Sequence, residues 1–456
     1  MSRYEKAVIP EELTPDAIQT EVERILASEK FARSKRLRSL LRFTVAQTLQ
    51  GNADMLKEYV IGTEVLKKPD SYDPRSDSLV RVLASRLRVK LKEYYSDGGS
   101  EDPLVIEFPK GKYVPRFQRR EQLQTEVEKK LRARNAYSQG RFAATKLSEP
   151  SLAEAAAHFE EAIDADPEWP QAHIGLAYVY AFQALLNYRR PRETWPLVRA
   201  QADAALQLDE MSADAHTLLG LVCALFEWRW RDAESHFNKG IERDNYSGSG
   251  RLWRAFAGLM PIGKLSGAEE ELVKARELAP AAFLDEAHLL ALYLSGQHDS
   301  VLRLTEGSSD SASMPAWRQW LRGCALAATG RTAQAVELLS AHNGDAHMIA
   351  TLGHICGASG EHDKAHEALA RLRERRDRGL WIANYDLAVV QAGLGNRNEA
   401  LALLQEALRE REPWMAFLTI DPRLSSLRTM PKFTGMARRI LLTEIEAAHS
   451  HGVAAV

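Results

Sequence analysis

The sequence has 456 residues, of which 45% are apolar, so it is too long for one ordinary domain and can bury a large core. Its formal net charge of −2 hides an asymmetry. Residues 1–120 hold 23 Lys and Arg against 18 Asp and Glu, whereas the remainder holds 37 against 44. A contact with nucleic acid is therefore expected only at the N-terminal end.

Three helices are predicted before residue 70. The first spans Thr14 to Ser28, with Thr14 as its cap and a proline at its first position. The second spans Ser34 to Gln50 and begins in a cluster of arginines and lysines. That cluster is equally consistent with phosphate binding and with a solvated face. Leu56 to Lys67 is predicted as the third helix, and Asp70 to Asp77 as the turn that follows it.

The stretch from Asp77 to Tyr95 is predicted to be a helix with one apolar stripe facing the core. The stripe consists of Val80, Leu83, Ala84, Leu87, Leu91 and Tyr94. No acidic residue occurs between Asp77 and Glu93, so the opposite face is almost purely basic, with two valines that have no reason to face water. Cations and small apolar groups are what a helix in a DNA major groove requires.

A β-hairpin is predicted directly after this helix. Leu104–Phe108 and Tyr113–Phe117 are expected to be its strands, with Lys110, Gly111 and Lys112 at the tip. Pro115 then requires an edge position in the second strand.

This order of elements resembles the winged-helix DNA-binding domain of bacterial OmpR-type and CadC-like regulators. The resemblance rests on Ser85-Arg86-Leu87-Arg88-Val89-Lys90-Leu91 and on Gly111-Lys112-Tyr113-Val114-Pro115-Arg116-Phe117, and it covers about a quarter of the chain. It implies three to four helices plus a hairpin wing, and binding to double-stranded DNA. The receiver domain that usually accompanies such a domain is not visible.

The outer face of the helix and the hairpin tip supply the candidate DNA-binding residues. Two arginines are expected to reach base edges, with two small side chains beside them: Arg81, Arg86, Val82 and Ser85. Four further cations are expected to hold phosphates: Arg88, Lys92, Lys110 and Lys112.

Beyond a charged helical junction at residues 121–130, the composition shifts to alanine, leucine and glutamate and a repeat appears. It is similar to the tetratricopeptide repeat, whose second helix follows A-x3-F-x2-A with a proline soon after. The fullest matches are Ala155/Phe159/Ala162/Pro167, Ala268/Leu272/Ala275/Pro280 and Ala400/Leu404/Ala407/Pro413. Weaker matches lie at Ala233/Phe237/Gly240, Ala335/Leu339 and Ala365/Leu369.

The spacing of these matches predicts about eight helix pairs between residues 131 and 413. A divergent repeat is expected from Phe283 to Thr305, and an insertion from Asn187 to Thr194. Residues 414–456 are expected to cap the last pair. The predicted fold is thus mostly α: a winged helix in residues 1–120 followed by an α-solenoid.

Several sequence patterns suggest a binding site but are better explained by a structural role. Gly258 to Lys264 has the skeleton of a phosphate-binding loop, but no strand precedes it and Leu265 replaces the magnesium-binding hydroxyl. His354, Cys356, His362 and His366 lie close in sequence, but core packing explains Cys356 better than a metal does. Five tryptophans are expected to wedge helices together rather than to line a peptide groove: Trp228, Trp230, Trp253, Trp317 and Trp320. No catalytic residue, metal or cofactor is expected.

The three cysteines, Cys223, Cys324 and Cys356, are odd in number and far apart, which favours a reducing cytoplasmic setting. Residues 1–10 lack the apolar stretch of a signal peptide, and no apolar run reaches the ~18 residues of a membrane span.

The leading functional prediction is a cytoplasmic, non-enzymatic DNA-binding transcriptional regulator. Its repeats would bind a protein or peptide, or self-associate. The alternative is a protein-interaction scaffold in which the winged helix serves as a docking or dimerisation module.

Overall fold

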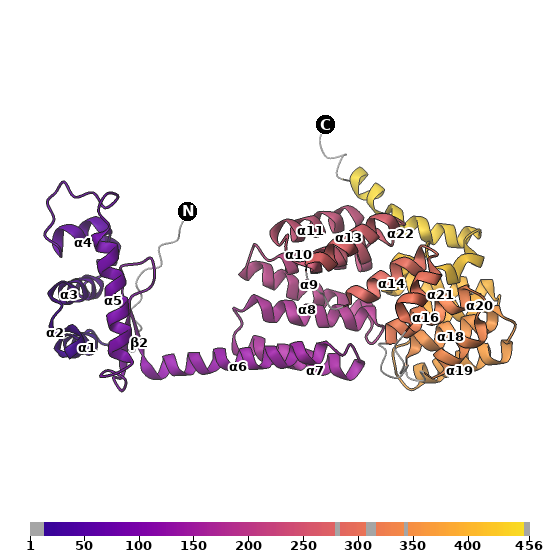
Figure 1. The fold of residues 1–456 in the computed structure, drawn as a ribbon, viewed down its shortest axis with the longest axis horizontal. Helices are drawn as coiled ribbons and strands as arrows, with labels where there is room; N and C mark the ends of the chain where they lie inside the picture. The colour runs from indigo at the N-terminus through magenta and orange to yellow at the C-terminus, as the bar shows by residue number, and fades with distance from the viewer. Residues whose placement is uncertain (1–12, 279–282, 307–315, 342–344, 451–456) are drawn as a thin grey trace. The chain divides into compact units, whose positions relative to one another are not determined.

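A computed structural model describes residues 13–278, 283–306, 316–341 and 345–450, with the backbone alone for 442–450. Pro280 of the repeat pattern and residues 1–10 lie outside the described residues. The chain divides into two compact units, residues 1–131 and residues 132–456 (Figure 1). None of the described helices is long and apolar enough to cross a lipid bilayer.

The N-terminal unit contains short helices and one small hairpin. In chain order its elements are α1 (Pro15–Ala27), α2 (Glu29–Ala32), α3 (Lys35–Leu49), the 3₁₀ turn η1 (Ala53–Met55), α4 (Glu58–Glu64), α5 (Leu79–Tyr95), β1 (Leu104–Glu107) and β2 (Arg116–Arg119). The hydroxyl of Thr14 accepts a hydrogen bond from the Ala17 amide, as expected of a cap. The short helix α2 was not expected from the sequence.

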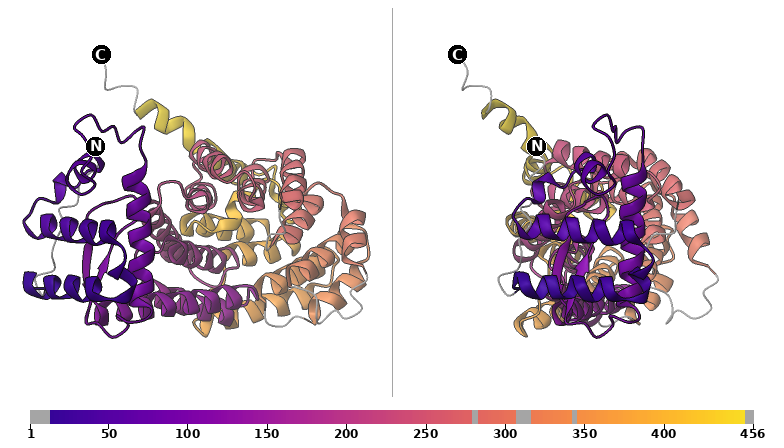
Figure 2. Two further views of the ribbon diagram at one scale, coloured as in Figure 1. Left: turned by 60° about the vertical axis from the view of Figure 1, so that its left-hand side comes forward. Right: turned by 90° about the vertical axis from the view of Figure 1, so that its left-hand side faces the viewer.

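A single apolar core joins these elements. Ile18 of α1, Leu41 of α3, Leu87 of α5 and Ile106 of β1 are all fully buried in it. Helix α3 lies beside α1 and crosses α5 (Figure 2). The predicted stripe of α5 is confirmed, because all six of its residues are buried. Its opposite face is consequently left to solvent.

The second strand of the hairpin differs from the prediction. The strands are antiparallel with Leu104 opposite Arg119 and Glu107 opposite Arg116, so β2 begins three residues later than expected. The connecting loop therefore runs from 108 to 115 and contains Pro109 and Pro115. Neither proline nitrogen can donate a ladder hydrogen bond, which explains why pairing starts only after Pro115.

Helix α6 (Arg120–Ala144) is continuous through the predicted junction and into the first repeat. Its residues before 131 are mostly exposed and charged. From Ala133 onward, small residues on one side are buried. One helix therefore serves both as the junction and as the first helix of the repeat array.

Within the described residues, the second unit contains eight helix pairs. They are α6 with α7 (Glu149–Ala165), α8 (Pro170–Leu185) with α9 (Pro191–Leu208), and α10 (Ala213–Leu221), extended by the π-helical turn η2 (Val222–Glu227), with α11 (Trp230–Arg243). Next come α12 (Gly248–Trp253), extended by η3 (Arg254–Leu259), with α13 (Leu265–Leu278), and α14 (Leu284–Leu294) with α15 (His298–Thr305). The last are α16 (Ala316–Ala328) with α17 (Thr332–Ser340), α18 (Ala346–Ala358) with α19 (His362–Asp377), and α20 (Asn384–Gly393) with α21 (Arg397–Glu410).

The small residues of the repeat motif lie where second helices meet their neighbours. Ala268, Ala275 and Ala400 are fully buried. A Cβ atom at Gly220 would lie 2.7 Å from the Phe237 ring, so glycine is what allows the two helices of that pair to approach. This paired packing makes residues 132–456 a tetratricopeptide-like helical repeat.

The predicted insertion is only partly a loop. Helix α9 begins at Pro191, so the last four residues of the expected 187–194 insertion form its first turn. The extra length is accommodated in the connection 186–190 and in two long helices.

The C-terminal segment reaches further than a cap on the last pair. It comprises the 3₁₀ turns η5 (Pro413–Phe417) and η6 (Pro422–Leu427) and helix α22 (Pro431–Ser450). These pack on α20 and α21, but η5 also contacts α8 and η2. The Trp230 indole N–H donates to the carbonyl of Ile440 at 2.9 Å. The segment therefore packs on the last pair as expected, and it also joins the end of the array to its early helices.

Candidate functional site

The outer face of α5 carries the exposed residues that were predicted to read DNA. Val82 and Val89 are 42% and 54% exposed, and Ser85 and Arg86 lie between them. Among the described residues, the Arg86 guanidinium has no hydrogen-bond or ion-pair partner, and the same holds for the Lys92 ammonium group. A helix face with an unengaged cation between exposed valines has no packing explanation within this unit.

Two of the predicted DNA-binding arginines are engaged within the N-terminal unit. Arg81 pairs with Glu58 of α4 at 3.0 Å and donates to the Pro74 carbonyl at 2.8 Å. Arg88 donates to the carbonyls of Phe108, Pro109 and Lys112 at 2.9–3.2 Å.

Arg88 thereby holds the hairpin loop against α5. Lys110 and Lys112 are exposed residues of that loop. The DNA-binding roles of all eight residues stay predictions. Arg81 and Arg88 would have to give up their present contacts within the unit in order to contact DNA.

The basic start of α3 is similarly divided. Arg42 forms a two-pronged ion pair with Glu23, which lowers the pKa of that carboxyl. Lys35 and Arg36 are exposed. Only part of this cluster is therefore available to an anionic partner.

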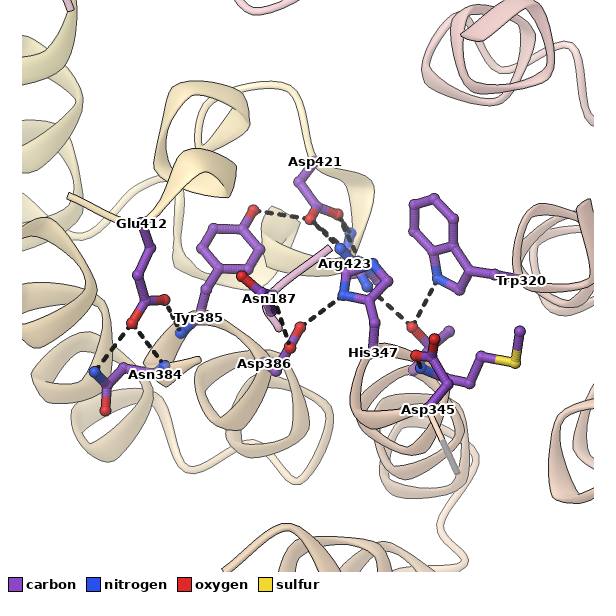
Figure 3. Close-up of polar contacts among 12 residues, drawn as sticks. Asn187, Trp320, Asp345, His347, Asn384, Tyr385, Asp386, Glu412, Asp421 and Arg423 are labelled. Atoms are coloured by element: carbon purple, nitrogen blue, oxygen red, sulfur yellow. Dashed lines mark hydrogen bonds and ion pairs between the residues drawn. The ribbon is translucent and has the colours of Figure 1, made fainter. Parts of the chain in front are cut away.

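The repeat unit contains an interior polar network centred on Arg423 of η6 (Figure 3). Its guanidinium binds the Asp421 carboxylate through Nε and Nη2, and it donates from Nη1 to Thr351 Oγ1 at 3.0 Å. The Tyr385 hydroxyl also donates to Asp421, at 2.8 Å. The Trp320 indole N–H donates to the same Thr351 oxygen.

Burial alone would raise the pKa of the Asp421 carboxyl. Arg423 outweighs it, so the pKa lies below its usual value. The network is therefore a charge-neutral, hydrogen-bonded link between the C-terminal segment and α16, α18 and α20. Because Arg423 and Asp421 are only 5% and 3% exposed, neither charge is available to a ligand.

Two further buried carboxylates lie near this network. Asp386 of α20 is contacted by His347 Nδ1 at 2.7 Å and by Asn187 Nδ2 at 3.2 Å. The second contact links the connection between α8 and α9 to a residue 199 positions away. Glu412 accepts the backbone N–H groups of Asn384 and Tyr385 at the start of α20. Burial raises the pKa of Glu412 to about 7 despite these hydrogen bonds.

A cavity with a volume of about 360 Å³ lies between α14, α16, α18 and η6. Its wall combines apolar and polar groups, among them Tyr293, Ala328, Thr351, His354, Ile355 and Arg423. Ala328 and Ala358 on its rim are exposed. We refer to it below as the α16–α18 cavity.

The sequence patterns that were set aside have ordinary structural roles. Gly258 to Lys264 runs from the helical turn η3 into the connection before α13, without a strand. The three cysteines are unpaired and buried, as expected for core residues, and burial raises the pKa of Cys324 to about 12. Across the described ranges, no three His, Cys, Asp or Glu side chains are arranged to hold a metal ion. Trp228, Trp253 and Trp320 are buried between helices, as a wedging role requires, whereas Trp230 and Trp317 are only partly buried against the same core.

Sequence reasoning missed the residues that build the network and the cavities, namely Asn187, Asp345, His347, Asp386, Asp421 and Arg423. One signal was available. Asp386 lies between Tyr385 and the apolar stretch Leu387–Val390, and a charge inside a buried helix usually has a partner. The identity of that partner was not readable from the sequence.

Comparison with known proteins gives distant likenesses. No family model and no curated protein matches the chain. Among solved structures it is similar to a monomeric IFIT1 mutant with Gppp-AAAA, at 15% identity and a TM-score of 0.37, covering 93% of this chain and 94% of that one. It is also similar to yeast Tom70, at 15% identity and a TM-score of 0.37, covering 92% and 90%. For the P58(IPK) TPR domain the identity is 14% and the TM-score 0.20, covering 68% and 99%.

These likenesses are too distant to bear on function. None points to an OmpR-type winged helix, so that resemblance continues to rest on the sequence motifs.

Proposed function

We propose that the protein is a non-enzymatic scaffold whose helical-repeat unit binds a peptide segment of a partner protein. The α16–α18 cavity carries this proposal, because its volume of about 360 Å³ is in the range of pockets that bury a ligand group. Stacked helix pairs are a common frame for such binding surfaces. The three unpaired cysteines favour a cytoplasmic setting for this function.

The chemistry of the cavity indicates an uncharged occupant. Arg423 is the cation in its wall, and its charge is balanced by Asp421. Ala328, Ile355 and the neighbouring alanines provide apolar surface, whereas Thr351 and His354 add polar groups. We therefore expect an apolar side chain of the partner, with its peptide groups hydrogen-bonded at the rim.

The test uses peptides selected by display against the full chain. Ala328→Trp places an indole at the mouth of the cavity from an exposed position, so it should block the selected peptides while leaving the melting temperature unchanged. Ala370→Trp, on the exposed face of α19, is the matched control and should bind like the parent. Equal peptide affinity in both variants would contradict the proposal.

A second candidate function is favoured by the outer face of α5. The unengaged Arg86, between exposed Val82 and Val89, has the chemistry of a helix that reads a major groove. We propose that residues 1–131 bind duplex DNA through this face, with Lys92 and Lys110 on phosphates. Retention of the full chain on immobilised random duplex should fall when Lys92 and Lys110 are both changed to alanine. Unchanged retention would favour a docking role for this unit.

A further inference from the structure

A second, smaller cavity lies where the end of α8 meets α16, α18 and η5. Figure 3 labels four residues of its wall, Asn187, Trp320, Asp345 and His347. Its volume of about 20 Å³ is enough for one group the size of a water molecule. Its wall includes Asn187, Trp317, Trp320, Asp345, His347 and Trp414. We refer to it as the tryptophan cavity.

Two buried side chains present hydrogen-bond acceptors to this cavity. Asn187 is 7% exposed and has the left-handed backbone conformation, with φ 58°, that asparagine tolerates better than most residues. Its Nδ2 donates to Asp386, which fixes the amide so that Oδ1 has no partner among the described residues. His347 is oriented by the same carboxylate through Nδ1. In the tautomer that places the hydrogen on Nδ1, the unpartnered Nε2 is also an acceptor.

A carboxylate completes the set. Asp345 caps α18 by accepting the Met348 amide at 3.0 Å, and its side chain is also part of the cavity wall. The described residues of the wall include no lysine or arginine. Asp386 lies directly behind Asn187 and His347, so a second carboxylate borders the cavity.

The remaining walls are aromatic rings. Trp317 and Trp414 stack with their centroids 5.8 Å apart, and Trp320 lies 5.4 Å from Trp317 and 5.7 Å from Trp414. The His347 ring stacks on Trp414 at 5.1 Å. Indole rings attract cations more strongly than other aromatic side chains do, and Arg423 already lies over the Trp320 ring, 5.3 Å from its centroid. The acceptors, the carboxylate and the aromatic wall therefore favour the same kind of ligand, a cation with N–H donors.

We propose that the tryptophan cavity binds the ε-ammonium group of a lysine side chain from the partner protein. The three N–H donors of a primary ammonium match the acceptors offered by Asn187, His347 and Asp345. A trimethylammonium or guanidinium group is too large for a space of about 20 Å³. This inference rests on the proposed scaffold function, which supplies the lysine.

The first test is calorimetric titration of the full chain with butylammonium, butanol and butyltrimethylammonium. Butylammonium should bind, butanol should not, and the trimethyl compound should bind at least about tenfold more weakly. Asp345→Asn keeps a residue that caps helices well but removes the charge. It should weaken butylammonium binding about tenfold, because a hydrogen bond to a charged group contributes roughly that factor or more.

Asp244→Asn is the matched control. Asp244 also accepts backbone N–H groups, those of Tyr246 and Ser247, but it is exposed and is not part of the cavity wall. It should bind butylammonium like the parent. The inference is overturned if the parent does not bind butylammonium, or if Asp345→Asn and Asp244→Asn bind it equally well.

The second test identifies the source of the ammonium. In the display-selected peptides, replacing lysine by norleucine should weaken binding about tenfold. If lysine and norleucine peptides bind alike, the lysine assignment is overturned. If peptides bind and Ala328→Trp abolishes their binding, but butylammonium does not bind, this inference fails while the scaffold proposal stands. If butylammonium binds but no peptide can be selected, the scaffold proposal fails, and the lysine assignment with it.

Discussion

Replacing Arg423 by methionine should strongly destabilise the repeat unit. The change leaves the apolar stem of the side chain in place but removes the guanidinium that faces Asp421, Thr351 and the Trp320 ring. Asp421 would keep only the Tyr385 hydroxyl and the backbone N–H of residue 423 as donors, at 3% exposure. An uncompensated buried charge of this kind costs about 3–5 kcal/mol.

The cost should depend on the charge of Asp421, which can be tested with a double-mutant cycle. Asp421→Asn alone leaves Arg423 without its counter-ion, whereas Asp421→Asn with Arg423→Met removes both charges. The double variant should therefore be more stable than the sum of the two single changes predicts, with a coupling energy of about 0.5–3 kcal/mol. Scanning calorimetry of the full chain measures all four proteins.

The same pair predicts the dependence of stability on pH. Because the pKa of Asp421 in the folded protein lies below its usual value of 3.8, its stabilisation is present above that pH. It is lost as the pH falls through the folded-state value. A change of less than about 1 kcal/mol for Arg423→Met, the range of an exposed pair, would refute the assignment of a buried link.

Three further predictions concern other parts of the chain. In anisotropy titrations of the full chain across a salt series, Arg86→Ala should cost about 1–3 kcal/mol on a specific duplex only, whereas Lys110→Ala should weaken binding to every duplex and reduce the salt slope by about 0.9. Parent-like binding by both variants would contradict DNA reading. Ala400→Trp should lower the free energy of unfolding by about 1–3 kcal/mol through overpacking, because Ala400 is fully buried; the exposed Ala370→Trp should not. Burial, aided by Asp102, raises the pKa of Glu21 from 4.5 to about 7. The protonated Glu21 side chain therefore stabilises the folded protein fully below pH 4.5, and this contribution is lost as the pH rises through 7. The free energy of unfolding of Glu21→Gln should not show that decline with rising pH. The same pH profile in the variant and in the parent would contradict the prediction.

The helix pairs were predictable because their determinants are local and repeated. Alanine at Ala268 and Ala400 recurs at the period that brings second helices together, and the stripe from Val80 to Tyr94 follows the helical period. The start of β2 was not predicted, because the effect of Pro115 on strand pairing was taken as an edge position rather than as a boundary.

The candidate sites were harder to predict because their contacts join distant parts of the chain. Nothing near Arg81 in the sequence reveals that Glu58 will engage it, and Arg88 is occupied by carbonyls of a loop some 20 residues later. The contact between Asn187 and Asp386 depends on how seven helix pairs stack. Sequence periodicity fixes which face of each helix is buried, but not which buried polar groups meet.

The most direct test of the scaffold function is hydrogen–deuterium exchange of the full chain with and without a selected peptide. We expect slower amide exchange in α16, α18 and η6, which line the α16–α18 cavity, and unchanged exchange in α5. In the Ala328→Trp variant the same peptide should slow none of these segments. Slowing confined to α5, or equal slowing in the parent and in Ala328→Trp, would contradict peptide binding by the repeat unit.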